Sequence, residues 1–135
     1  MADRLAIENV LATWALGYDD RRPELMERCF TADATMTLHI GDQETMGPYV
    51  GRDEVMRHFT DHHEIQTDQR RHVVTNVTIE LDEPTEARTT SVLTLLVVDG
   101  GEVRVQATGV YRDHFVEADG RWCIRERVLR LDAHY

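Results

Sequence analysis

The 135-residue sequence is poor in cysteine and proline, and it contains no long apolar run. The two cysteines, Cys29 and Cys123, are too few for a disulfide framework and lack the spacing of paired metal ligands. A transmembrane helix would need about 18 consecutive apolar residues, and the sequence has no such run. The first residues also lack the layout of a secretory signal. We therefore expect reduced thiols in a cytoplasmic protein.

Positive charge is scarce as well. Lysine and arginine together number 15 against 25 aspartates and glutamates, so the formal net charge is −10. Such a surface repels the phosphates of nucleic acids and of anionic membranes, and we expect neither as a partner. A neutral small-molecule substrate is compatible with this charge.

The motifs of phosphate binding, dinucleotide binding and covalent serine chemistry are also missing. His58 and His62 are four residues apart, which suits a metal pair on a helix, but no further ligand stands at a characteristic offset. The sequence therefore predicts neither a cofactor nor a metal site.

The first half of the chain has helical periodicity. After Asp3, a candidate N-cap, apolar residues recur at intervals of three and four up to Asp19, which predicts an amphipathic helix. Pro23 suits the start of a second helix, which should reach about Phe30. The elements expected after it are a strand over 35–40, a loop or short strand over 47–51 and a third helix over 53–63.

From Arg71 onward the pattern changes to strands. Four β-rich stretches are separated by turn residues at hairpin spacing, which predicts an antiparallel meander. Helices followed by long strands indicate an α+β fold rather than an alternating α/β fold. We expect one domain over 1–135, in which three N-terminal helices pack on a strongly curved, mainly antiparallel sheet and leave a cone-shaped cavity. The four stretches are 71–82, 86–98, 102–116 and 121–131.

His72 and Asp19 are the residues most suited to proton transfer. His72 shares one face of its predicted strand with Val74 and Asn76. This face is either simply solvated or lines a pocket, where a histidine can act as general base or acid. Asp19 ends the first helix, where the helix dipole disfavours a carboxylate, so it needs a donor such as His72. The pattern leaves open whether the two residues meet or Asp19 belongs to an exposed acidic turn.

Several short motifs, in fixed order, resemble the SnoaL-like proteins of the nuclear-transport-factor-two-like superfamily. The motifs are Tyr18-Asp19, Cys29-Phe30-Thr31-Ala32-Asp33-Ala34, Tyr49-Val50-Gly51-Arg52-Asp53, His72-Val73-Val74-Thr75-Asn76 and Asp119-Gly120-Arg121-Trp122-Cys123-Ile124. The resemblance extends over nearly the whole chain. The superfamily includes scytalone dehydratase, hexachlorocyclohexane dehydrochlorinase, ketosteroid isomerase and polyketide cyclases. The resemblance implies that this chain has their cone-shaped α+β fold.

The resemblance also implies roles for three residues. Tyr18 and Asp19 match a Tyr-Asp pair of the dehydratase. His72 matches the histidine that the dehydratase and the dehydrochlorinase use as base, paired with an aspartate at the position of Asp19. By this resemblance, His72 removes a proton, Asp19 stabilises the imidazolium and Tyr18 donates a hydrogen bond to the substrate oxygen. The other expected pocket residues are Trp14, Tyr49, Phe59, Asn76 and Tyr111.

The sequence departs from the dehydratase at two positions. Leu38 stands near the place of its second tyrosine, and residues 95–97 stand at the place of its second histidine. The groups that serve its leaving group are therefore missing, with Tyr111 a candidate replacement for one of them. The departures argue against the same substrate. The first interpretation is therefore a cofactor-free enzyme that carries out elimination, isomerisation or ring formation on another small, mostly apolar oxygenated compound.

A second interpretation is a non-catalytic ligand-binding protein or dimerising scaffold, like the small subunit of ring-hydroxylating dioxygenases, which shares the fold. An enzyme needs His72 at the wall of a pocket, whereas a scaffold does not. We also expect a homodimer through the outer face of the sheet, because residues assigned to that face are too apolar for open solvent. They are Val73, Val77, Ile79, Leu93, Leu95 and Val97.

Overall fold

The computed structural model describes residues 1–133, which form three helices and one six-stranded sheet. The helices are α1 (Arg4–Asp19), α2 (Pro23–Glu27) and α3 (Arg52–Ile65). The strands are β1 (Phe30–Ile40), β2 (Glu44–Val50), β3 (Gln69–Asp82), β4 (Glu86–Asp99), β5 (Glu102–Ala118) and β6 (Arg121–Leu131). The predicted α+β class with a curved, mainly antiparallel sheet is confirmed.

Helix α1 begins and packs as its sequence predicts. The Asp3 side chain caps it by accepting a hydrogen bond from the Ala6 amide at 3.0 Å. Gly17 lets α2 approach closely, since a Cβ at this position would lie 3.0 Å from the Leu25 Cβ. Across residues 1–133, no helix combines the length and the apolar character that crossing a bilayer requires.

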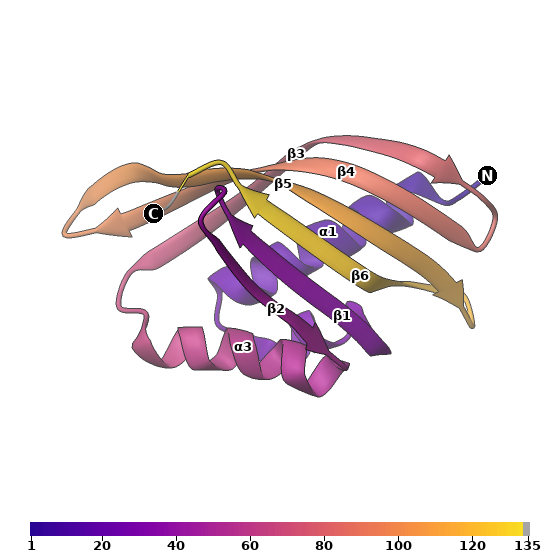
Figure 1. Cartoon of the computed structure of the whole chain (residues 1–135), viewed down its shortest axis with the longest axis horizontal. Coiled ribbons are helices and arrows are strands. Elements are labelled where there is room, and N and C mark those ends of the chain that lie inside the picture. Colours follow the sequence, from indigo (N-terminus) through magenta and orange to yellow (C-terminus); the bar gives the residue numbers. More distant parts are fainter. Residues whose placement is uncertain (134–135) are drawn as a thin grey trace.

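The strand order in the sheet is β2-β1-β6-β5-β4-β3. Strands β3 to β6 form the predicted meander, and β1 joins it as the parallel neighbour of β6, with Phe30 opposite Ile124. Helix α1 contacts β3 and β6, and α3 contacts β1 and β2. Figure 1 shows α1 crossing behind the strands and α3 lying below the β1–β2 edge, so the helices cover one face of the sheet.

Apolar side chains between the helices and the inner face of the sheet form the core. In β1, Met36, Leu38 and Ile40 are buried on one face, as their alternation predicts. A second cluster adjoins the main core. Its buried members are Leu38, Ile40, Leu93, Leu95, Tyr111 and Leu131.

One segment between α1 and α3 differs from the sequence prediction. Helix α2 ends at Glu27 rather than near Phe30, because Phe30 is already the first residue of β1 and is buried against its partner strand. Residues 47–50 agree with the expected loop or short strand over 47–51, because they belong to β2, which pairs with β1 along a bulged register. Gly51 follows at the N-cap of α3.

The predicted inward position of Asn76 is wrong. The register of β3 on β4 shifts between Thr75 and Thr78, and Asn76 takes a left-handed backbone conformation with φ 56° at this bulge. The extra residue reverses the alternation, so Val77 and not Asn76 follows His72 and Val74 on the inner face. Asn76 is exposed and lies outside the cavity.

The residues assigned to the outer face of the sheet are also mostly misplaced. Leu93, Leu95 and Val97 are buried on the inner face, and the bulge turns Val77 and Ile79 toward the core. Val73 alone of the six lies outside, with 39% of its surface exposed. Five of the six residues are therefore not exposed on the outer face, and their apolar character is no argument for a dimer interface there.

The bulge at Asn76 yields a test of the fold. We expect Asn76→Val to lower the free energy of unfolding by about 1–2 kcal/mol, because a β-branched residue is strained in the left-handed region. Asn76→Gly should leave stability within a few tenths of a kcal/mol of wild type. Urea denaturation of the two variants measures the difference, and equal stabilities would contradict the left-handed bulge.

Candidate active site

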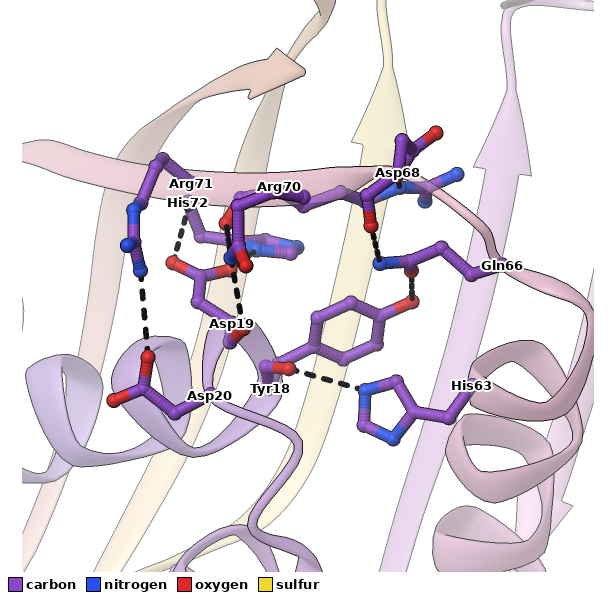
Figure 2. Close-up of polar contacts among 10 residues, drawn as sticks. Tyr18, Asp19, Asp20, His63, Gln66, Asp68, Arg70, Arg71 and His72 are labelled. Atoms are coloured by element: carbon purple, nitrogen blue, oxygen red, sulfur yellow. Dashed lines mark hydrogen bonds and ion pairs between the residues drawn. The ribbon is translucent and has the colours of Figure 1, made fainter. Parts of the chain in front are cut away.

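Asp19 and His72 meet through two hydrogen bonds. Asp19 Oδ1 lies 2.7 Å from His72 Nδ1, and Asp19 Oδ2 accepts from the His72 backbone amide at 2.9 Å. Figure 2 shows the carboxylate directed from the end of α1 toward β3. Because a carboxylate only accepts, the ring proton lies on Nδ1, and the lone pair of the neutral ring lies on Nε2.

The pair is largely removed from solvent. The exposed fractions of the His72 and Asp19 side chains are 8% and 4%. Two aromatic rings make T-shaped contacts with the imidazole, with ring centroids 5.3 Å away at Trp14 and 4.8 Å away at Tyr18. The ring is therefore held in one orientation by packing and by the carboxylate together.

His72 lies at the wall of a cavity between the helices and the sheet. Four other residues expected there also line it: Trp14, Tyr18, Phe59 and Tyr111. The remaining lining residues are Met36, Leu38, His58, His62, Arg70, Leu93, Leu95, Arg127, Leu129 and Leu131. The walls are thus mainly aliphatic and aromatic, with a few polar groups.

Tyr49, expected in the pocket, is not among these lining residues. Its ring lies against His58, 4.6 Å between centroids, in a separate surface cleft that also contains Glu54 and Asp61. Tyr49 belongs to β2, the edge strand outside β1, and it packs at the margin of the core rather than in the cavity.

The Tyr18 side chain is near His72, but its hydroxyl is engaged. It donates a hydrogen bond of 2.8 Å to Gln66 Oε1, and Gln66 Nε2 donates in turn to the Asp68 carbonyl at 3.0 Å. His63 Nε2 lies 3.1 Å from the Tyr18 carbonyl oxygen (Figure 2). A substrate oxygen would have to replace Gln66 as the acceptor of the Tyr18 hydroxyl.

A buried ion pair that the sequence analysis missed lies at the same cavity. Arg127 Nε and Nη2 donate to the two oxygens of Asp113 at 2.8 and 3.1 Å, and both side chains are almost completely buried. The guanidinium carbon lies 3.9 Å from the Tyr111 ring centroid and 4.8 Å from that of Trp14.

Burial and the Asp113 carboxylate act on the protonation of Arg127, and burial acts on that of Tyr111. Burial alone would lower the pKa of Arg127, but the Asp113 carboxylate outweighs this effect and raises the pKa above its ordinary value. Burial raises the pKa of Tyr111 to about 12. Arg127 is therefore charged and Tyr111 is neutral across the physiological range.

His58 and His62 lie together on α3, with ring centroids 4.3 Å apart. His62 Nδ1 donates to the His58 carbonyl at 2.8 Å, and burial, aided by the His62 imidazole, lowers the pKa of His58 to about 4. Within residues 1–133, no group of three histidine, cysteine or acidic side chains is placed to hold a metal ion.

Comparison with known proteins identifies the domain family and supports the fold. Residues 1–128 match the model of the SnoaL-like domain. No curated protein sequence matches the chain. A Mycobacterium tuberculosis protein of unknown function is 24% identical, with a TM-score of 0.80 over 95% of this chain and 70% of that one.

Two similar structures come from Novosphingobium aromaticivorans, and the two proteins carry different functional names. A proposed scytalone dehydratase is 23% identical, with a TM-score of 0.76 over 96% of this chain and 87% of that one. The beta subunit of a proposed aromatic-ring-hydroxylating dioxygenase is 17% identical, with a TM-score of 0.83 over 98% of this chain and 90% of that one. At these identities the likeness establishes the fold alone.

The lowered pKa of His58 predicts a loss of stability in acid. Between its ordinary value of 6.5 and about 4, the unfolded chain binds a proton that the folded protein excludes. The stabilising contribution of His58 is thus complete above pH 6.5 and is lost as the pH falls toward 4. Thermal melts should show a smaller acid-induced decrease in Tm for His58→Gln than for wild type, and identical decreases would contradict this assignment.

Proposed function

The chain belongs to the SnoaL-like domain family, and we propose that it is a cofactor-independent acid–base enzyme of this family. It would act as a dehydratase or other lyase, an isomerase or a polyketide-type cyclase on a small, mostly apolar oxygenated compound. The observation that carries the proposal is the Asp19–His72 pair, buried at the wall of a cavity.

His72 would be the general base. With its proton on Nδ1 and Asp19 holding that proton, the ring offers the Nε2 lone pair to an acidic C–H group. The carboxylate would then stabilise the imidazolium that forms, as in catalytic triads. Such acid–base assistance is worth about 10²–10⁴-fold in rate.

The cavity supports a small, mostly apolar substrate. Leucine, methionine and aromatic side chains form most of its wall, and they favour a compound with an apolar body. The same position of His72 argues against a pure scaffold, since a scaffold has no need of an ordered, carboxylate-bound histidine at a cavity. Tyr18 would donate to the substrate oxygen once this oxygen replaces Gln66.

The alternative function is a ligand-binding protein or a dimerising scaffold. The apolar residues on the outer face of the sheet favour it. Apart from Val73, these exposed residues are not the ones that the sequence assigned to this face. Val105 and Val103 are 62% and 66% exposed and lie opposite Leu96 and Val98 in the register of β4 and β5. Together with Val73 they form an apolar surface typical of an interface.

Proton transfer can be tested without knowledge of the natural substrate. We expect the protein to accelerate hydrogen–deuterium exchange next to the carbonyl of small cyclic or aryl ketones, followed by NMR in D2O. His72→Ala should lose about 10²–10⁴-fold of this rate because it removes the base. Asp19→Asn should lose as much or less, and Tyr18→Phe should lose least, about tenfold, because it removes one hydrogen bond.

Circular dichroism of each variant provides the control for folding. Exchange at the wild-type rate in a folded His72→Ala protein would disprove the role of His72. A broad ketone panel that shows no exchange above the buffer rate would favour the ligand-binding or scaffold alternative.

A homodimer through the outer face remains part of the proposal, now with the residues that the described sheet exposes. Light scattering at micromolar concentration should give a dimer for wild type and a monomer for Val105→Glu, because the charge would be buried without a partner. The matched control is Leu5→Glu on α1, an exposed leucine away from this face. A monomeric wild type would contradict the dimer.

A further inference from the structure

Two arginines line the cavity of His72, and they differ in what they offer a ligand. Arg127 is committed to Asp113 through Nε and Nη2, and its Nη1 is enclosed by protein. Arg70 donates from Nε to Asp68 Oδ1 at 3.2 Å, and within residues 1–133 its two Nη atoms have no hydrogen-bond partner and are not enclosed. Arg70 is therefore the cavity cation whose donors a ligand can reach.

Arg70 lies beside His72 on the inner face of β3. The two residues are two positions apart in a regular stretch of the strand, so their Cα atoms are about 6.6 Å apart. Arg70 comes next to the start of β3, and its side chain is 18% exposed, whereas that of His72 is 8% exposed. The guanidinium therefore belongs to the rim of the cavity, and an occupant in contact with His72 can extend to it.

A chain of contacts holds the Arg70 guanidinium in one orientation. The Tyr18 hydroxyl donates to Gln66, and Gln66 donates to the carbonyl of Asp68, whose carboxylate binds Arg70 Nε. Figure 2 shows the part of this chain from Tyr18 to Asp68, at the start of β3. Because Nε is occupied, the edge formed by Nη1 and Nη2 is left. This planar edge matches the two oxygens of a carboxylate.

The charges near this rim favour an anion, although the protein as a whole has a net charge of −10. Asp68 compensates the charge of Arg70, but a further cation stands close by. Arg21 donates to the carbonyl oxygens of His63 and Gln66 at 2.7 and 2.8 Å, and no carboxylate within residues 1–133 is paired with it. The loop before β3 therefore has a positive charge that is not compensated.

We propose that Arg70 is a specificity-determining residue that binds a carboxylate of the substrate through Nη1 and Nη2, so that the cavity takes small apolar carboxylic acids. This proposal rests on the proposed function and names its substrate class. The leucine side chains of the wall contact the apolar body, and the carboxylate stays at the rim, where it keeps part of its hydration. Arg70 positions the substrate and takes no part in proton transfer by His72.

Pairs of acids and amides test the site without the natural substrate. 3-Phenylpropanoate and cyclohexanecarboxylate each have an apolar body and a carboxylate, and their primary amides have nearly the same shape without the charge. We expect wild type to bind at least one of the two acids about tenfold more tightly than its amide in isothermal titration calorimetry, since hydrogen bonds to a charged group are the stronger ones. Equal affinities within both pairs, or no binding of any of the four compounds, would overturn the proposal.

Variants of two adjacent arginines assign the preference to one side chain. Arg70→Gln removes the charge and the planar edge, and it should bind acid and amide equally. The matched control is Arg71→Gln, because Arg71 is 52% exposed and paired with Asp20, and this variant should keep the preference of wild type. A folded Arg70→Gln protein that keeps the preference would overturn the proposal.

A second variant keeps the test decisive if Arg70→Gln does not fold. Arg70→Lys retains the positive charge but cannot offer two parallel N–H groups to one carboxylate. It should retain only part of the preference for the acid, and a preference equal to that of wild type would contradict recognition through Nη1 and Nη2.

The outcomes separate this proposal from the proposed function. A wild-type protein that accelerates deuterium exchange of ketones but binds acids and amides equally would overturn the carboxylate site and leave His72 as base untouched. A preference for the acid that Arg70→Gln abolishes, in a protein without exchange activity, would support the site and contradict the enzyme.

Discussion

The carboxylate of Asp19 is the interaction on which the site depends. It stands at the negative end of the α1 dipole, where a carboxylate is disfavoured, and it is buried as well. Two N–H groups of His72, one from the backbone and one from the ring, offset both costs. The same two bonds tie the end of the first helix to β3 and set the ring at the cavity wall. One contact therefore fixes both the position of the candidate base and the nitrogen that carries its proton.

The polar groups of the cavity are arranged in two buried pairs. Asp19 with His72 and Asp113 with Arg127 each bring a carboxylate to a nitrogen donor, and the aromatic rings of Trp14 and Tyr111 lie between them. A buried ion pair is a weak source of stability compared with apolar packing of equal volume.

The sequence predicts the fold more fully than the site. The apolar spacing that identifies a helix or a strand is still recognisable when one residue is inserted, but the direction in which each side chain faces is not. The helix of Arg4–Asp19 and the four long strands follow from apolar spacing alone. Register does not, because one extra residue at Asn76 reverses the face of the side chains that follow it in β3, up to the second register shift after Ile79. A second irregularity between His114 and Phe115 brings Asp113 opposite Arg127, whereas unbroken hairpin counting would pair it one residue earlier. The buried ion pair was therefore invisible to pattern reading.

The parallel pairing of β1 with β6 has a consequence for the order of folding. Phe30 and Ile124 are neighbours in space although most of the chain separates them, so their contact closes a long loop and carries a high entropic cost. The meander of β3 to β6 consists of local hairpins and can form early. In the described sheet β1 is linked to the meander through β6, so β1 acquires its place only after β6 has left the ribosome. The first strand of the chain is thus completed by the last, and the cavity cannot exist on a partly synthesised protein.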